Sequence, residues 1–254
     1  IGNNILKNLA KNTSLDLLCI GRNIKNRHYK NSKIKHLSWN FTTFKKKNLL
    51  FLKKADIIIN CVGKTENNSY DLENINVIFV RKLLKYINFY RSNIRLIHLS
   101  SIAVYGGSKN YLGQHKLISE NSAIKANDLY SKSKFKGDSL IQNAIKKKLN
   151  KNFSYTILRI SNVFGGRKKT NLLKYVMFSM KFGIWFKTYN DIMFNFINVR
   201  DVTQAVILII SNLRVSKNKT YIVSDDCKQY KLYEKYKDYY KKKIIKIKVP
   251  ISLI

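Results

Sequence analysis

The segment Ile97-His98-Leu99-Ser100-Ser101-Ile102-Ala103-Val104-Tyr105-Gly106 is the most informative part of the sequence for the fold. It begins as an apolar run, which is typical of a buried strand, and passes through two serines into a loop that ends at a glycine. In open α/β sheets, ligands bind beyond the carboxyl ends of parallel strands. A hydroxyl at that position, Ser101, can therefore hydrogen-bond a reacting oxygen.

Short apolar runs alternate with longer helical patterns on both sides of this stretch. The predicted strands are 15–20, 34–37, 56–62, 94–99 and 155–160, and the predicted helices are 3–11, 45–54, 72–90 and 128–149. This alternation is typical of βαβ units, and continuous β-branched strands indicate helices on both faces of a parallel sheet. The sequence thus predicts an α/β fold with a doubly wound, Rossmann-type parallel sheet.

The pattern loosens after Gly165. We expect a helix over 172–182, extended pieces over 184–197, a helix over 202–212, a strand over 220–224, and then a Tyr/Lys-rich helix before a final apolar stretch. We therefore predict a first domain over 1–165 and a smaller C-terminal α/β lobe over 166–254, with some elements returning to the core sheet. Substrate pockets often form between such lobes.

Tyr130 and Lys134 are four residues apart, on one face of a predicted helix. A phenol has a reference pKa of about 10 and a Lys ammonium about 10.4, so a nearby cation is needed to make the phenolate accessible near neutral pH. Such a phenol can act as an acid or a base toward a hydroxyl or a carbonyl. Alone, the spacing is a weak signal, because most Tyr-x-x-x-Lys pairs lie on solvated helix faces, and the surrounding sequence has to decide.

In this context the chain resembles the NAD-dependent epimerase/dehydratase family of extended short-chain dehydrogenases/reductases. The resemblance lies in Ser-Ser-x-Ala-Val-Tyr-Gly at 100–106 and in Tyr-x-x-Ser-Lys at 130–134, with Asp138 where the family usually has Glu. It implies an NAD(P)-dependent enzyme that acts on a nucleotide-diphosphate sugar. The implied catalytic residues are Ser101, Tyr130 and Lys134, of which Ser101 also binds substrate and the other two also bind cofactor.

Four further segments resemble the family in the expected order: Asn60-Cys61-Val62-Gly63, Asn76-Val77, Leu158 to Gly165, and Phe196 to Val202. The resemblance implies that the first domain binds the dinucleotide and that the C-terminal lobe mainly binds substrate. It places Cys61, Val62, Gly63 and Asn76 beside the cofactor. It places Asn162 and Asn198 beside the substrate, with Asn198 where the family usually has His.

The start of the sequence resembles the end of the family's Gly-x-x-Gly-x-x-Gly motif, with Gly2 as the third glycine. In that motif the backbone approaches the cofactor's pyrophosphate at a helix N-terminus. The resemblance implies that the first strand and the first two glycines are missing from this sequence. We therefore expect residues 1–254 alone to bind a dinucleotide poorly.

The end of the second strand of this fold discriminates between NAD and NADP. NAD enzymes usually place an acid there for the ribose 2′-hydroxyl, whereas Arg suits the 2′-phosphate of NADP. This chain has Ile20-Gly21-Arg22-Asn23, followed by Lys25 and Arg27. Both cofactors are possible, but the missing acid favours NADP, with Arg22 as a cofactor-binding residue.

Three reactions share the implied machinery: 4-epimerisation, 4,6-dehydration and reduction of a keto sugar. Dehydratases of the family typically carry Asp-Glu directly after the catalytic Ser or Thr, whereas this chain has Ile102-Ala103, neither of which can move a proton. The sequence therefore predicts a nucleotide-sugar epimerase or 4-ketoreductase. The two stay open.

A formal net charge of +35 raises two other function classes. Such a field attracts polyanions, but the lysines are scattered along the chain, which favours a coding bias over a nucleic-acid-binding or membrane-binding face. A non-catalytic Rossmann protein that senses dinucleotide or scaffolds partners is the main alternative to an enzyme.

The remaining composition indicates a protein of a reducing compartment. Cys19, Cys61 and Cys227 lie far apart, so neither a disulfide framework nor a metal site is predicted. No apolar run approaches the roughly 20 residues of a membrane span, and no signal-peptide pattern opens the chain. We expect a cytoplasmic enzyme, and the family resemblance implies a homodimer.

Overall fold

A computed structural model describes residues 1–11, 14–21, 34–39, 54–65, 68–89, 93–106, 117–147, 151–165, 181–189, 193–241 and 243–250. The predicted helices over 45–54 and 172–182 lie almost entirely outside these residues, and so does Arg22.

The centre of the molecule is a parallel sheet with strand order β3-β4-β5-β9. Its strands are β3 (Ile57–Asn60), β4 (Arg95–Ser101), β5 (Ser154–Ile160) and β9 (Lys219–Val223). Ser101 pairs with Ile160 at the carboxyl ends of β4 and β5. These strands confirm the predictions for 56–62, 94–99, 155–160 and 220–224 to within a few residues at each end.

Two further parallel strands, β1 (Leu17–Gly21) and β2 (Ile34–Ser38), pair with each other. Among the described residues, β1 is hydrogen-bonded to β2 and β3 to β4, so these six parallel strands form two groups, β1-β2 and β3-β4-β5-β9. Ile20 of β1 and Ile58 of β3 nevertheless pack against the same hydrophobic core. The strands predicted over 15–20 and 34–37 are thus confirmed as parts of this layered domain.

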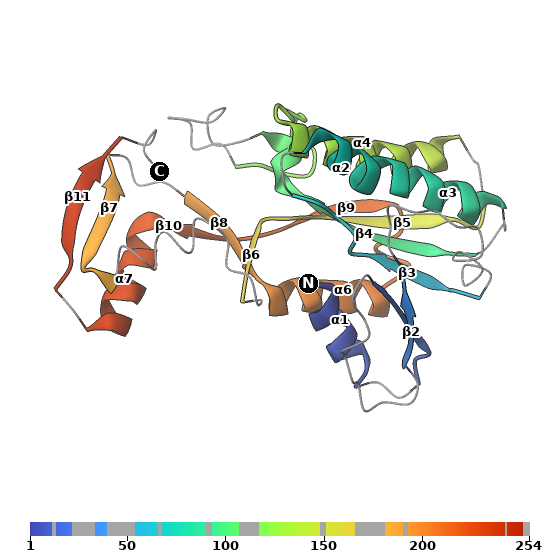
Figure 1. Ribbon diagram of the computed structural model, residues 1–254, viewed down its shortest axis with the longest axis horizontal. Helices are drawn as coiled ribbons and strands as arrows, with labels where there is room; N and C mark the ends of the chain where they lie inside the picture. The colour runs from blue at the N-terminus through green and yellow to red at the C-terminus, as the bar shows by residue number, and fades with distance from the viewer. Residues whose placement is uncertain are drawn as a thin grey trace.

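Helices cover both faces of the central sheet (Figure 1). On one face, α1 (Gly2–Leu9) packs beside α6 (Val199–Ser211) over a core that includes Ile97 and Leu158. The other face carries α2 (Ser69–Leu72), a π-helical turn (Glu73–Ile78), α3 (Phe79–Phe89) and α4 (Leu129–Lys146). Apolar side chains of these helices fill a second core, and each fully buried one contributes about 1.5–3 kcal/mol. The predicted doubly wound fold is confirmed.

The C-terminal half adds two small sheets and a helix, to the left of the central sheet in Figure 1. One sheet has strand order β10-β8-β6, from β6 (Asn162–Phe164), β8 (Met193–Asn198) and β10 (Asp225–Lys228). The other pairs β7 (Ile184–Thr188) with β11 (Ile245–Val249), and α7 (Gln229–Tyr240) packs on it through the Trp185–Tyr233 ring contact. Two elements of the C-terminal half, α6 and β9, lie in the central domain instead, as the sequence analysis expects. The boundary between the two domains at residue 165 stays a prediction.

The sequence did not predict β6 and β10. They are short and contain Asn162, Asp225 and Asp226, residue types that are depleted in strands. Both form because they pair with the apolar strand β8 on either side of it. Long-range pairing therefore overrides local preference here.

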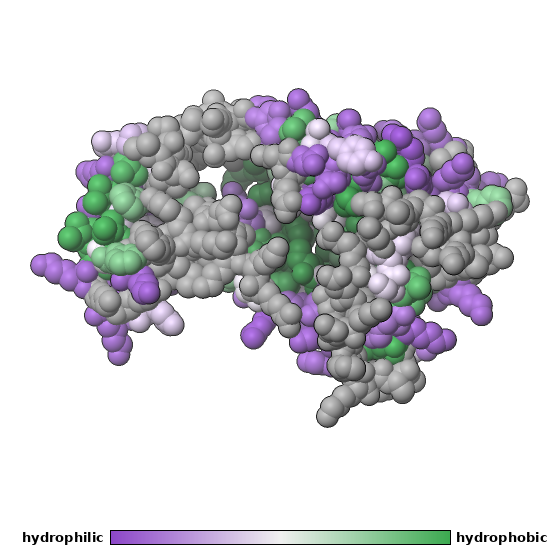
Figure 2. All heavy atoms as spheres, viewed as in Figure 1, coloured by the Kyte–Doolittle hydropathy of each residue, from purple (hydrophilic) through white to green (hydrophobic). Residues whose placement is uncertain are grey.

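The space-filling view shows a hollow between the two halves, with apolar residues visible in its depth (Figure 2). On the face shown, hydrophilic residues are spread over the periphery of both halves. Within the described residues, no helix is long and apolar enough to cross a membrane.

Candidate active site

Ser101 ends strand β4 and begins a tight turn over Ile102–Tyr105. Its hydroxyl oxygen accepts a hydrogen bond from the Ala103 backbone N–H at 3.2 Å, and the buried Val104 and Tyr105 anchor the turn. Ser101 is thus held at the carboxyl end of the sheet, the position that the sequence predicts for it.

Helix α4 begins at a fixed point because Asp128 forms a capping box with Ser131. The Ser131 N–H donates to Asp128 Oδ1 at 2.8 Å, and the Asp128 N–H donates to Ser131 Oγ at 3.2 Å. Tyr130 consequently lies in the first turn, where burial raises the pKa of its phenol and a hydrogen bond with the Ser101 hydroxyl lowers it. The structure therefore brings Tyr130 and Ser101 together.

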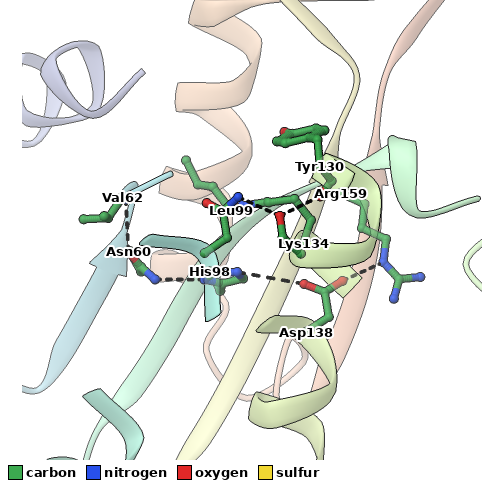
Figure 3. A network of polar contacts seen from close by, with 10 residues as sticks. Asn60, Val62, His98, Leu99, Tyr130, Lys134, Asp138 and Arg159 are labelled. Carbon is green, nitrogen blue, oxygen red and sulfur yellow. Dashed lines mark hydrogen bonds and ion pairs between the residues drawn. The ribbon is translucent and has the colours of Figure 1, made fainter. Parts of the chain in front are cut away.

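Lys134 lies one turn further along α4 and is only 5% exposed. Its Nζ donates to the backbone oxygen of Leu99 at 2.7 Å, as Figure 3 shows. Burial lowers the pKa of this ammonium, and the nearby Asp138 carboxylate raises it. The sequence predicts that Lys134 acidifies the phenol, but in this structure burial dominates the Tyr130 pKa and the ammonium is directed at strand β4.

Asn76 is held by the π-helical turn between α2 and α3, and it is 3% exposed. Its side-chain oxygen accepts from the Lys64 N–H at 3.0 Å, while its amide donates to the Lys64 oxygen at 3.1 Å and to Ser133 Oγ at 2.9 Å. A Cβ on Gly63 would lie 3.7 Å from Asn76 Oδ1 and 3.8 Å from Lys134 Nζ. Three predicted cofactor-binding residues, Gly63, Asn76 and Lys134, are thus neighbours.

Gly137 allows the π-helical turn to approach α4. A Cβ at this position would lie 2.8 Å from the backbone oxygen of Asn76. We expect Gly137→Ala to destabilise the protein by about 1–3 kcal/mol, because the helix and the turn would have to separate. Thermal unfolding measures this loss. The exposed Asn143 of the same helix is the control, since Asn143→Ala should change stability by no more than about 0.5 kcal/mol, and an equally small effect of Gly137→Ala would contradict the prediction.

The start of α1 meets the segment after β3. A Cβ on Gly2 would lie 3.3 Å from Cys61 Cβ and 3.5 Å from Cys61 Sγ. The absence of a side chain at Gly2 thus lets a helix N-terminus lie beside the segment predicted to contact the cofactor. Gly2 and Cys61, both predicted to bind the cofactor, are thus neighbours.

Two of the three residues predicted to bind substrate, Asn162 and Asn198, lie in the sheet of β6, β8 and β10. Asn162 is exposed and its amide donates to the Asn195 backbone oxygen at 3.1 Å. Asn198 caps helix α6, because its side-chain oxygen accepts from the Arg200 N–H at 2.9 Å. A Cβ on Gly165 would lie 2.9 Å from the same oxygen. Asn162 follows β5 within two residues of Ile160, the partner of Ser101, whereas Asn198 has a capping role.

A chain of buried polar groups runs under these residues (Figure 3). Asn60 Oδ1 accepts from the Val62 N–H at 3.0 Å, and Asn60 Nδ2 lies 3.0 Å from His98 Nδ1. His98 Nε2 lies 3.9 Å from Asp138 Oδ1, and Arg159 Nε donates to Asp138 Oδ2 at 3.1 Å. The sequence analysis did not select His98 or Arg159. A signal existed, since a polar residue inside a buried strand needs a buried partner.

The tautomer of His98 follows from this chain. The Val62 N–H fixes the Asn60 oxygen, so the Asn60 amide nitrogen faces His98 Nδ1, which accepts. A neutral ring then carries its proton on Nε2, toward Asp138. Burial, followed by the Lys134 charge, lowers the pKa of His98 well below 6.5.

This pKa makes stability depend on pH. Below about pH 6.5 the unfolded chain binds a proton at His98 that the folded chain excludes, so stability falls as the pH falls, by up to about 1.4 kcal/mol per pH unit for one such group. Denaturant unfolding between pH 7.5 and pH 5 measures this. In His98→Gln the part of the pH dependence that comes from His98 should be absent. If the free energy of unfolding changed equally with pH in both proteins, the expectation would be contradicted.

A family model described as "NAD dependent epimerase/dehydratase family" matches residues 1–224. The chain belongs to the NAD-dependent epimerase/dehydratase family. The resemblance read from the sequence is confirmed, and with it a nicotinamide dinucleotide as the cofactor of the family. No curated protein matches the chain.

Solved structures of this family share the fold. The UDP-Glc/GlcNAc 4-epimerase from Campylobacter jejuni superposes with a TM-score of 0.78 at 19% identity, over 98% of this chain and 83% of that one. The UDP-glucuronic acid 4-epimerase from Bacillus cereus, in complex with NAD, gives 0.77 at 14% identity, over 98% and 84%. The dTDP-glucose 4,6-dehydratase from Bacillus anthracis, also with NAD, gives 0.74 at 15% identity, over 98% and 80%.

Proposed function

We propose that this family member is an NAD(P)-dependent nucleotide-sugar 4-epimerase or 4-ketoreductase, with Tyr130 as its acid/base residue. The observation that carries the proposal is the position of Tyr130 in the first turn of the capped helix α4, where its phenol interacts with the Ser101 hydroxyl at the carboxyl end of β4. Two hydroxyls at that edge of a parallel sheet can hold one reacting oxygen between them.

Each residue has a separate task in this proposal. The nicotinamide, when bound, supplies or accepts the hydride. Ser101 orients the sugar oxygen, and Tyr130 donates a proton to a C4 carbonyl oxygen during reduction or removes it from the hydroxyl during oxidation. The raised pKa of Tyr130 keeps the phenol protonated near neutral pH, which suits the donor role. Lys134 supplies a buried positive charge one helical turn away.

The backbone around Gly2 and Gly63 and the side chains of Asn76 and Lys134 would hold the dinucleotide. The family description and the neighbours crystallised with NAD support NAD or NADP as the cofactor. We propose NADP as the preferred form, because Gly21 ends β1 with no acid beside it. Affinities for the two dinucleotides, measured by calorimetry, test this, and a clear preference for NAD would refute it.

A nucleotide-diphosphate sugar is the proposed substrate, with Asn162 and Asn198 as proposed contacts. One neighbour, MoeE5, was crystallised with UDP-glucose and NAD, at a TM-score of 0.74 and 14% identity, over 98% of this chain and 81% of that one. Ile102 and Ala103 follow Ser101, and neither can transfer a proton, which supports epimerisation or reduction over dehydration. The expected homodimer and cytoplasmic location stay predictions.

The test is an assay of nucleotide sugars with analysis of the products. It is run on this chain and on a form preceded by a strand and a glycine-rich turn, with NAD(P)⁺ and with NAD(P)H. An epimerase interconverts two sugars without net consumption of cofactor, whereas a ketoreductase oxidises one NAD(P)H per 4-keto sugar. Dinucleotide binding without turnover of any sugar would overturn the proposal in favour of a sensing or scaffold protein.

A further inference from the structure

Asp138 is a fully buried carboxylate on helix α4, with an exposed fraction of 0%. It lies between two strands of the central sheet. Arg159 of β5 donates to Oδ2 at 3.1 Å, and His98 of β4 approaches Oδ1 at 3.9 Å (Figure 3). Burial raises the pKa of this carboxyl, and the Arg159 charge, the largest opposing influence, lowers it. An uncompensated charge at such a depth costs several kcal/mol, so this group is retained only with partners.

Lys134 shares the helix face of Asp138, one turn toward the N-terminus. Both side chains are buried, and the ammonium is held by the backbone oxygen of Leu99, the residue that follows His98 in β4. The charged groups buried on this side of the sheet are therefore Lys134 and Asp138 of α4 and Arg159 of β5, with a neutral His98. A carboxylate among two cations offsets the cost of burying them.

We propose that Asp138 is a positioning residue, which acts through Lys134 by keeping the buried ammonium charged and directed at the Leu99 oxygen. The proposal rests on the proposed function in one respect only, which is that Lys134 takes part in catalysis. Asp138 does not itself touch the reacting atoms. Its effect reaches them through the helix turn that carries Lys134 and Tyr130.

The same carboxylate also faces the cofactor side of the site. Its Oδ1 lies 3.9 Å from Nε2 of His98, whose other nitrogen accepts from Asn60, and Asn60 in turn accepts from the Val62 N–H. Val62 belongs to the segment predicted to bind cofactor. One buried charge thus connects the catalytic helix with that segment.

A direct titration of Lys134 tests the proposal without any need for turnover. In protein labelled with ¹³C at lysine Cε, a buried lysine titrates at lower pH than exposed ones, and its signal is assigned by its loss in Lys134→Met. In Asp138→Asn we expect the Lys134 midpoint to fall by on the order of one pH unit. Asp138→Glu should restore most of it.

Glu73→Gln is the matched control. It removes a carboxylate that faces the same helix, in an exposed ion pair with Lys136 at 3.1 Å, and should leave the Lys134 midpoint unchanged. An unchanged midpoint in folded Asp138→Asn would overturn the proposal. If Asp138→Asn does not fold, the double variant Asp138→Leu/Arg159→Met removes both charges of the pair, and there too the midpoint must fall.

Turnover gives a second readout. In an active enzyme, loss of the Lys134 proton ends activity at high pH, so the alkaline limb of kcat/KM should move to lower pH in Asp138→Asn by the shift seen in the titration. A merely structural role would lower kcat/KM at all pH values without moving the limb. A wild-type chain without turnover would defeat the proposed function, while the titration would still decide the role of Asp138.

Discussion

Tyr130→Phe is expected to lower kcat for the proposed hydride transfer by a factor of about 10² to 10⁴. The variant keeps the ring and its packing but removes the hydroxyl that is in contact with Ser101. Without that hydroxyl, no proton can be exchanged with the sugar oxygen at this position. Initial rates measure the loss, and a dinucleotide binding isotherm measured beside them separates a loss of turnover from a loss of cofactor binding.

Tyr70→Phe is the control for this substitution. It makes the same chemical change at a tyrosine of α2 that is 76% exposed, and it should leave the rate unaltered. Full turnover of Tyr130→Phe would remove Tyr130 from the mechanism. A loss of dinucleotide binding in that variant would instead show a binding role for the hydroxyl.

Arg159→Met is expected to destabilise the protein by about 3–5 kcal/mol. Arg159 is 4% exposed, and the substitution leaves Asp138 buried without its cationic partner. It also removes the 2.6 Å hydrogen bond from Arg159 Nη1 to the Tyr105 hydroxyl, which anchors the turn after Ser101. Denaturant-induced unfolding near neutral pH measures the change.

Two comparisons isolate the cause of that loss. Arg200→Met, at an exposed position of α6, should alter stability by no more than about 0.5 kcal/mol. The double variant Asp138→Leu/Arg159→Met should regain most of the stability, because replacing both partners of a buried ion pair by apolar residues is often close to neutral. If Arg159→Met and the wild type unfolded at the same denaturant concentration, the Asp138–Arg159 pair would not be important for stability.

The fold class and the elements that carry the site could be predicted from the sequence. Apolar runs such as 94–99 and helical spacing such as 128–149 depend on local periodicity, which survives in a single chain without knowledge of its contacts. The position of Ser101 at a strand end and the four-residue spacing of Tyr130 and Lys134 follow from the same periodicity. Together these features also carried the family resemblance.

The charges and the contacts of the site could be seen only in the folded protein. The π-helical turn that buries Asn76, the direction of Lys134 toward Leu99 and the pairing of Asp138 with Arg159 depend on contacts between residues far apart in the chain. Burial then raises the pKa of Tyr130, whereas the spacing alone predicts a phenol acidified by Lys134. Spacing sets which side chains share a face, but desolvation and partners across the sheet set their proton affinities, and both exist only in the folded chain.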